Sequence, residues 1–370
     1  MASSLRLRAA KIPRSRLLVF ALFFVIFAVT TAFGQLRRHK AHGKPIFPTQ
    51  KPVSGFSDGL SVKGYDKPEG LKIIGLVFFG RKNRVEILRC FLERNLVDNG
   101  GWLDEIHWVK NTDNRKDLAY LEEILASSSR YKMVEVEGVG FVGYGLAWTQ
   151  LEPGNLYVKI DDDVVWFADD TIPRIVSMKL AHPDYLVVSA NVVNSPLMGW
   201  VHYHMGAVRP YMPELTDYEP TIFNLGQPSR KPWTYWSYPT WTGLKSWAIA
   251  AQEHYSFLEN LADDRLDTYR MSSSADRGGT DKAWLTIDQR LSINMITVWA
   301  DDVLDNLPMD DVDEQWLTLI LPKKLKRQVA VNTDALAVHF TFGSQGTVET
   351  TDLLARYRDY AFENACAMWV

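Results

Sequence analysis

Short apolar runs alternate with amphipathic stretches from Leu71 onward, and this alternation limits the folds that the chain can adopt. Apolar runs of this length predict buried strands, and the stretches between them have the spacing of helices. Strands that alternate with helices form βαβ units, in which the strands lie parallel and helices cover the sheet. We therefore predict an α/β fold with a doubly wound, mixed but mainly parallel sheet and flanking helices.

Ligands of such sheets bind at the carboxyl ends of the strands, so polar residues that directly follow a strand are the first candidates for a site. Strands are predicted at Leu71–Phe79, Glu105–Val109, Tyr131–Val136, Leu156–Ile160 and Tyr185–Ser189, with later apolar segments at Ile293–Trp299 and Ala335–Phe342. Helices are predicted at Asn83–Val97, Lys116–Ala126, Tyr144–Leu151, Ile172–Leu180, Lys245–Leu261 and Thr351–Glu363.

Three consecutive acids, Asp161, Asp162 and Asp163, follow the strand predicted at Leu156–Ile160 and precede the apolar run Val164–Phe167. Carboxylates two residues apart in an extended backbone point the same way, and two such oxygen ligands suit Mn²⁺ or Mg²⁺. A solvated acidic loop is the alternative, because adjacent acids also occur elsewhere in this chain. Acids between two buried runs are costly unless they are paired or bind a metal. We therefore predict a divalent-metal site at Asp161 and Asp163.

A glycine pattern, Gly138-x-Gly140-x-x-Gly143, lies between a predicted strand and a predicted helix. Asp161 follows it by about 20 residues, a spacing typical of dinucleotide-binding folds, in which the glycines admit the pyrophosphate and the acid binds the ribose. Two strand–helix units precede the pattern, however, and three adjacent acids exceed what ribose binding needs. The alternatives are an NAD-binding oxidoreductase and a glycine-rich turn that permits close packing.

Two later acidic pairs, Asp301-Asp302 and Asp313-Glu314, are candidates for a general base, which takes a proton from a hydroxyl group during transfer. A solvated helix start is the alternative for Asp313. His339 lies in an apolar strand, where a single histidine is usually a core residue. Aromatic rings crowd a stretch near residue 240, and such rings suit either the apolar faces of sugars or core packing. Within this stretch, Trp233, Trp236 and Trp241 are the residues predicted to bind an acceptor.

The first 44 residues carry nine Lys or Arg and no acid, whereas the whole chain of 370 residues has a formal net charge of -3. The rest therefore has 32 basic against 44 acidic residues, a poor match for nucleic acid. Residues 17–33 form an uncharged, mostly apolar run at the short end of the lengths that span a bilayer. A cleaved signal peptide is the alternative, but its apolar region is usually shorter. Basic residues behind the run favour a retained membrane anchor.

These features predict a cytoplasmic tail at 1–16, a transmembrane signal anchor at 17–34 and a stem rich in Pro, Gly and Lys at 35–70. The predicted catalytic domain is 71–346, and a C-terminal helix and tail follow at 347–370. The two cysteines, Cys90 and Cys366, are either free thiols or one bridge.

Several stretches together resemble the GT-A-type glycosyltransferases, which use nucleotide-diphosphate sugars, and in particular a membrane-anchored branch known mainly from fungi. They cover most of Leu71–Gly346, and the acidic triplet is the most specific part. The matching stretches are LVFFGRKNRVEIL, YVKIDDDVVWF, SANVVNSPLMGWVHYHMGA, HYSFLENL, RLSINMITVWADDV, DEQWLTLILP and AVHFTFGSQG.

This resemblance implies roles for individual residues. Asp161 and Asp163 would bind Mn²⁺ or Mg²⁺, and His339 would be a further metal ligand. Asp313 or Glu314 would be the base, and inversion or retention stays open; Asp301 or Asp302 is the alternative that the sequence pattern itself offers. The nucleotide sugar would contact Phe79, Arg81, Asn111 and Asp162.

The predicted activity is transfer of a sugar from a nucleotide-diphosphate donor to a glycan, glycoprotein or polysaccharide acceptor. We expect a single-pass type II membrane protein, held in the Golgi with a lumenal catalytic domain. Besides the oxidoreductase, the alternatives are a metal-dependent phosphoesterase, which needs a second set of metal-binding acids, and a non-catalytic, membrane-tethered carbohydrate-binding protein.

Overall fold

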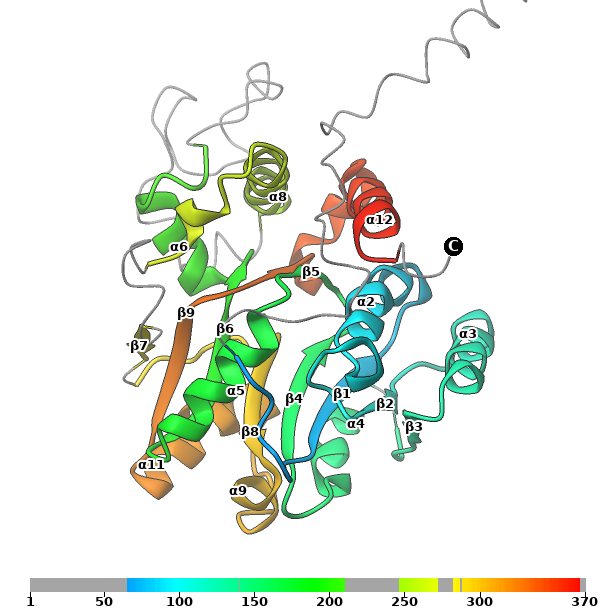
Figure 1. Ribbon diagram of the computed structural model, residues 1–370, viewed down its shortest axis with the longest axis vertical. Helices are drawn as coiled ribbons and strands as arrows, with labels where there is room; N and C mark the ends of the chain where they lie inside the picture. Colours follow the sequence, from blue (N-terminus) through cyan, green and yellow to red (C-terminus); the bar gives the residue numbers. More distant parts are fainter. Residues whose placement is uncertain (1–64, 139, 210–245, 272–281, 287, 367–370) are drawn as a thin grey trace, which may run out of the picture. The chain divides into compact units, whose positions relative to one another are not determined.

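The computed structural model describes residues 65–138, 140–209, 246–271, 282–286 and 288–366. All of them belong to the unit Pro52–Val370 (Figure 1). The predicted tail, the anchor and most of the predicted stem lie outside the described residues, as do Trp233, Trp236 and Trp241. No helix within the described ranges is both long enough and apolar enough to cross a bilayer.

A single mixed sheet of nine strands organises the described residues, in the order β3-β2-β1-β4-β8-β6-β9-β5, with β7 paired to β9. Its strands are β1 (Ile73–Phe79), β2 (Glu105–Lys110), β3 (Tyr131–Val134), β4 (Leu156–Asp161), β5 (Val164–Phe167), β6 (Tyr185–Val193), β7 (Ala283–Leu285), β8 (Met295–Trp299) and β9 (Gln328–His339). The pairings give β1, β2, β3, β4, β6 and β9 one direction, and β5, β7 and β8 the other. The predicted α/β fold with a mainly parallel sheet is therefore confirmed.

Helices flank this sheet, as the alternation in the sequence predicts. The α-helices are α2 (Lys82–Arg94), α3 (Arg115–Ser127), α4 (Phe141–Ala147), α5 (Thr171–Ala181), α6 (Pro196–His204), α8 (Trp247–Ala262), α9 (Ala300–Leu304), α10 (Asp313–Gln315), α11 (Leu321–Leu325) and α12 (Leu353–Asn364). Helix α5 lies against β6 and β9, and α2 lies against β5 and α12 (Figure 1). The helix predicted at Tyr144–Leu151 is divided between α4 and a 3-10 turn at Trp148–Gln150.

The side chains of β1 alternate between two faces of the sheet. Phe78 belongs to a core cluster that also contains Trp148 and Trp316. Phe79 faces the other way and packs edge-on against Trp108, with ring centroids 6.2 Å apart. Successive residues of a strand point to opposite faces, so a shift of one residue decides which side chain reaches a site.

A disulfide joins Cys90, on α2, to Cys366, beyond the end of α12, with Cα atoms 4.7 Å apart. It links two helices that already contact each other. The two cysteines, for which the sequence left both states open, are therefore one bridge.

Candidate active site

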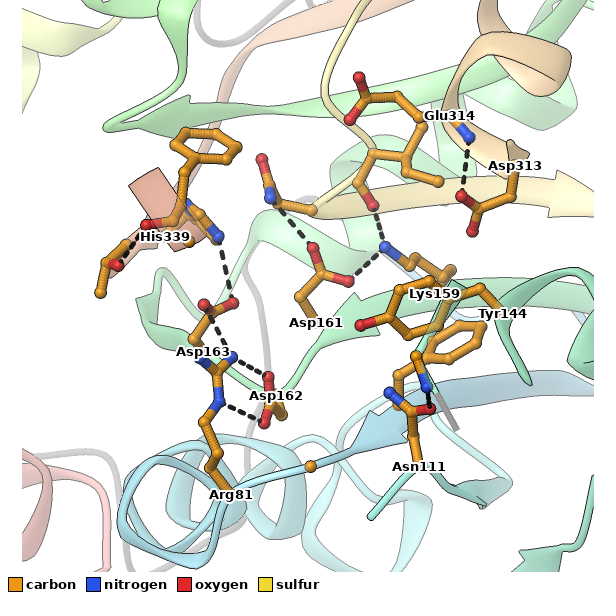
Figure 2. Close-up of a pocket in the computed structure, with 18 of the residues that line it drawn as sticks. Arg81, Asn111, Tyr144, Lys159, Asp161, Asp162, Asp163, Asp313, Glu314 and His339 are labelled. Carbon is orange, nitrogen blue, oxygen red and sulfur yellow. Dashed lines mark hydrogen bonds and ion pairs between the residues drawn. The ribbon is translucent and has the colours of Figure 1, made fainter. Parts of the chain in front are cut away.

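A cavity of about 710 Å³ lies where β1, β2, β4 and β9 end and where β8 begins. Since β8 runs antiparallel to β4, its first residues share this edge with the last residues of β4, and Asp161 N donates to Asn294 O at 2.9 Å. The fold thus brings loops that are distant in the sequence to one opening (Figure 2). The residues of most interest in its lining are Phe78, Arg81, Asn111, Tyr144, Lys159, Asp161, Asp162, Asp163, Asn294, Asp313, Glu314, His339 and Phe342.

Asp161 is the last residue of β4, and a cation and an amide hold its carboxylate. Its Oδ2 accepts a hydrogen bond from Asn294 Nδ2 at 3.0 Å, and its Oδ1 forms an ion pair with Lys159. Lys159 Nζ also donates to the carbonyl oxygen of Ile293 at 2.7 Å. Burial works to lower the pKa of Lys159, but Asp161 and Asp313 raise it above its usual range, so this residue is a buried ammonium group.

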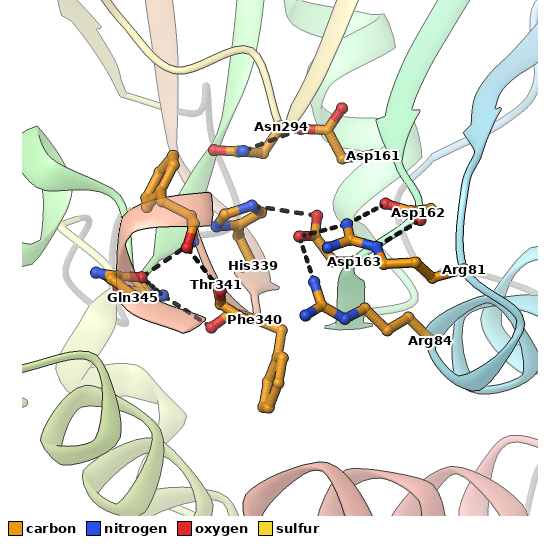
Figure 3. Close-up of polar contacts among 12 residues, drawn as sticks. Arg81, Arg84, Asp161, Asp162, Asp163, Asn294, His339, Phe340, Thr341 and Gln345 are labelled. Atoms are coloured by element: carbon orange, nitrogen blue, oxygen red, sulfur yellow. Dashed lines mark hydrogen bonds and ion pairs between the residues drawn. The ribbon is translucent and has the colours of Figure 1, made fainter. Parts of the chain in front are cut away.

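Asp163 is buried and its two carboxylate oxygens face different partners. Oδ1 lies 3.1 Å from His339 Nε2. Oδ2 accepts from Arg84 at 2.9 Å and from Arg81 at 3.0 Å. Burial works to raise the pKa of Asp163, but His339 and the two arginines hold it well below its usual range. Figure 3 shows this carboxylate between the guanidinium groups and the imidazole.

The backbone also joins Asp163 to the segment that carries His339. Strand β5 starts directly after the triplet and pairs with the end of β9, opposite His339. The carbonyl oxygen of Asp163 then accepts a hydrogen bond from the N–H of Phe340 at 2.8 Å. The pairing of these two strands therefore brings together side chains that lie far apart in the sequence.

Asp162 forms a two-pronged ion pair with Arg81, at 3.0 Å from Nε to Oδ2 and 2.6 Å from Nη2 to Oδ1. Gly80 permits this approach, because a Cβ there would lie 3.0 Å from Asp162 Oδ2. The Arg81 side chain is 44% exposed and reaches the cavity, whereas Asp162 is buried. The structure thus places these two residues, predicted to contact the nucleotide, beside each other.

The residues Asp161, Asp163 and His339 fit a divalent metal ion. One possible ligand atom from each lies within 4.8 Å of the others. The 3.1 Å between Asp163 Oδ1 and His339 Nε2 matches the spacing of about 3.0 Å between adjacent ligands of an octahedral ion bound at about 2.1 Å. Two carboxylates and an imidazole are a donor set suited to Mn²⁺ or Mg²⁺.

The glycine pattern forms a turn that folds onto Asn111. The side-chain oxygen of Asn111 accepts from Gly140 N at 2.7 Å. Gly140 has a φ of 67°, and a Cβ on Gly143 would lie 2.9 Å from the carbonyl oxygen of Gly138. The turn follows β3, which is an edge strand, whereas a dinucleotide site requires a point where the strand order reverses. Close packing therefore accounts for these glycines.

Asp313 and Glu314 begin α10 on the other side of Lys159 from the acidic triplet (Figure 2). Asp313 Oδ2 accepts from Trp148 Nε1 at 3.3 Å. Glu314 forms an ion pair with Arg290. Burial raises the pKa of Glu314, and Arg290 and Lys159 oppose that rise without cancelling it.

Asp301 and Asp302 lie at the opposite edge of the sheet and do not line the cavity. They follow β8, whose antiparallel direction carries its end away from the acidic triplet. Asp301 accepts from Gly154 N at 2.9 Å, and Asp302 pairs with Lys179 and Arg327. The prediction of Asp301 or Asp302 as the alternative base is therefore wrong, because neither residue lines the cavity.

The contact predicted at Phe79 needs the same kind of correction. The Phe79 side chain is fully buried against Trp108, and Phe78 lines the cavity in its place. Two residues of the site that the sequence reasoning missed are Lys159 and Arg84. A lysine inside an apolar strand, two positions before Asp161 and therefore on the same face, was a usable signal for Lys159.

No protein-family model matches the chain, and a search of curated proteins finds no similar sequence. Among solved structures, 4-diphosphocytidyl-2C-methyl-D-erythritol synthase from Anaerococcus prevotii is 14% identical with a TM-score of 0.27, over 34% of this chain and 56% of that one. Mannosyl-3-phosphoglycerate synthase from Rubrobacter xylanophilus is 16% identical with a TM-score of 0.26, over 34% and 41%. TarS from S. aureus is 16% identical with a TM-score of 0.27, over 51% and 56%.

The chain thus matches about half the length of these three solved structures. Their TM-scores are all far below 0.5, so the likenesses add nothing to what the strand order and the cavity show for this chain.

Proposed function

We propose that this chain is a metal-dependent glycosyltransferase, which transfers a sugar from a nucleotide-diphosphate donor to a glycan, glycoprotein or polysaccharide acceptor. One observation carries the proposal. A single cavity, at the carboxyl ends of the strands, holds the group Asp161, Asp163 and His339 on one side of Lys159 and the acids Asp313 and Glu314 on the other. In this arrangement a donor would bind on one side of Lys159, and the group that activates an acceptor lies on the other side.

The donor side is the part of the cavity near the acidic triplet. Asp161, Asp163 and His339 would hold Mn²⁺ or Mg²⁺, and the ion would neutralise charge on the leaving nucleotide diphosphate. Arg81, whose side chain is 44% exposed, lines this side of the cavity and carries a guanidinium group that suits an anionic donor. Asn111 and Asp162 line the same side and are proposed to contact the nucleotide.

The acceptor side is the part near α10. Glu314 is the proposed base, because burial raises its pKa and a base with a raised pKa takes a proton more readily. Asp313 is fixed by Trp148 and by the N–H of Glu314, at 2.8 Å, and is proposed to orient the acceptor. The acceptor contacts predicted at Trp233, Trp236 and Trp241 remain part of the proposal.

Residues 17–33 are proposed to anchor the catalytic unit in the Golgi membrane, with the unit on the lumenal side. The disulfide between Cys90 and Cys366 supports this placement, because disulfides form and persist in oxidising compartments.

The proposal is tested by purifying the full chain in detergent and measuring hydrolysis and transfer across a panel of nucleotide sugars, with and without Mn²⁺. We expect turnover of one donor class that depends on the metal. Asp161→Asn is expected to reduce it at least about 100-fold, the scale of losing one charge-stabilising group at a reaction centre. Turnover that ignores both Mn²⁺ and this substitution contradicts the metal-dependent mechanism.

The phosphoesterase reading is tested in the same assay with simple phosphate esters. Among the described residues, cations surround the triplet: Asp162 pairs with Arg81, and Asp163 pairs with Arg81 and Arg84. In the part of the chain that the structure describes, that arrangement leaves no second pair of acids next to Asp161 and Asp163 for a second metal ion, so we expect no ester hydrolysis. Ester hydrolysis without sugar transfer would favour the phosphoesterase.

A further inference from the structure

Two buried amide side chains, Asn194 and Gln345, form a reciprocal pair behind the metal-binding group. Asn194 Nδ2 donates to Gln345 Oε1 at 3.0 Å, and Gln345 Nε2 donates to Asn194 Oδ1 at 3.1 Å. Both residues are at most 3% exposed. Asn194 follows β6 with a φ of 58°, a left-handed conformation that asparagine tolerates better than most residues.

This amide pair fixes the backbone that directly follows His339. Asn194 Nδ2 also donates to the carbonyl oxygen of Phe340 at 2.9 Å. Gln345 Oε1 accepts from the N–H of Phe342 at 3.1 Å. The pair therefore holds the chain on both sides of Thr341.

The held segment fixes the imidazole of His339 from two directions. The N–H of Phe340 donates to the carbonyl oxygen of Asp163, which ties the segment to the acidic triplet. The ring of Phe342 lies against the imidazole, with centroids 4.4 Å apart. A shift of Phe340 or Phe342 would move His339 Nε2 relative to Asp163 Oδ1, the two atoms that lie 3.1 Å apart.

Core stability alone does not account for the pair. Buried amides gain little over apolar side chains of the same shape, and they are costly when a partner is missing. What a satisfied network adds is a single defined geometry. Here the pair forms hydrogen bonds with the backbone of Phe340 and Phe342, on either side of Thr341 and directly after the proposed ligand His339.

We propose that Asn194 and Gln345 are positioning residues, which hold His339 in the orientation that binds the metal ion. This role rests on the proposed metal-dependent function. Residues that orient a metal ligand typically change metal affinity by about 10- to 100-fold when they are replaced.

The test measures Mn²⁺ affinity of the full chain by electron paramagnetic resonance, without any sugar donor. Asn194→Gly removes the amide and still permits the left-handed backbone. Gln345→Met removes the other amide and keeps the volume of the side chain. Each variant is expected to weaken Mn²⁺ binding by about 10- to 100-fold.

Asn191→Ala is the matched control. Asn191 is equally buried on β6, and its amide bonds the carbonyl oxygens of Tyr269 and Thr333, away from the segment that follows His339. We expect it to lower thermal stability about as much as Asn194→Gly and to leave the Mn²⁺ Kd within about threefold of the parent value.

Two results overturn the positioning role. One is an unchanged Mn²⁺ Kd in folded Asn194→Gly and Gln345→Met, and the other is an equal loss in Asn191→Ala. Failure of the proposed function looks different, because then the unaltered chain either binds no Mn²⁺ or binds it without sugar transfer in the assay described above. If Asn194→Gly does not fold, Gln345→Met decides alone.

Discussion

Two groups with the same chemical inventory lie at opposite edges of the sheet. Each has two carboxylates and one histidine, with possible ligand atoms within 4.8 Å of one another. One is Asp161, Asp163 and His339, at the carboxyl ends of β4 and β9. The other is Glu105, His107 and Glu152, near the amino ends of β2 and β4.

Cations pair with the acids of both groups, and the groups differ in their access to a cavity. In the glutamate group, Lys72 lies 3.0 Å from each carboxylate, and Lys132 lies 2.8 Å from Glu105 and 3.3 Å from Glu152. Two ammonium groups thus neutralise two acids at a surface that the cavity does not include. In the aspartate group, Lys159 pairs with Asp161 and the arginines bind one oxygen of Asp163, but the other oxygen of Asp163 faces His339 and all three residues line the cavity. An inventory of ligands therefore does not define a metal site unless those ligands also line a cavity that an ion can enter.

The largest expected effect is that of Asp163→Asn. The neutral amide removes a charged ligand and leaves Arg84, which is 1% exposed, with Glu349 as its remaining ion-pair partner. We expect donor turnover to fall at least about 100-fold and Mn²⁺ binding to become too weak to detect by electron paramagnetic resonance. Glu105→Gln is the matched change in the other group, and it should leave both measurements at the parent value. Equal effects of the two substitutions would erase the distinction between the groups.

The next effect is that of Glu314→Gln, expected to reduce kcat about 100-fold while the Mn²⁺ affinity stays unchanged. A base acts in its deprotonated form, so activity should fall as the pH drops through the pKa of Glu314, which burial raises. The variant should lack this acidic limb in a pH profile of kcat/KM. Asp301→Asn, at the opposite edge, serves as the control. If the pH profile of Glu314→Gln matches that of the parent, Glu314 is not the base.

A smaller effect is expected for Lys159→Met. The Lys159 ammonium group lowers the pKa of Glu314, so its removal should shift the acidic limb of the pH profile toward higher pH. At neutral pH we expect activity to fall about tenfold, since the carboxylate of Asp161 also loses its cation. If the acidic limb of a variant that still binds Mn²⁺ lies at the same pH as that of the parent, Lys159 does not influence the base on the acceptor side.

The smallest effect concerns the glutamate group and appears in stability alone. Burial works to raise the pKa of Glu105, but hydrogen bonds from Lys132, His107 and Lys72 lower it to about 2. A folded-state pKa below the unfolded value contributes stability that is present above the unfolded pKa and is lost as the pH falls toward about 2.

Lowering the pH from about 6 to about 2.5 should therefore reduce the free energy of unfolding of the parent more than that of Glu105→Gln. The expected difference, measured by urea unfolding, is up to about 1 kcal/mol for such partly exposed pairs. A second Mn²⁺ site in the parent that Glu105→Gln removes would contradict this comparison. It would show that a metal ion can displace the lysines from the glutamate group.

The sequence predicts the part of the site that depends on local order. The acidic triplet stands out because it directly follows an apolar strand, and that placement alone puts Asp161 at the edge of the sheet. His339 gives no such signal, since a histidine in an apolar strand reads as a core residue. Only the pairing of β5 with β9, across more than 150 residues of chain, brings it to Asp163.

Strand direction and side-chain alternation explain the corrections. The sequence around Asp301 and Asp302 resembles any other strand end, because nothing local reveals that β8 runs antiparallel to β4. Phe79 and Phe78 are chemically identical neighbours, and only the packing of Trp108 against β1 decides which of them faces the cavity. Long-range pairing therefore limits what the sequence alone can show.

The disulfide closes a covalent ring that contains most of the chain. The acidic triplet, the amide pair and His339 all lie between Cys90 and Cys366 in the sequence, whereas Arg81 and Arg84 lie before the ring begins. A single proteolytic cut within this ring opens it without dividing the chain. The two fragments then migrate as one species on a denaturing gel and separate only when a reductant is added.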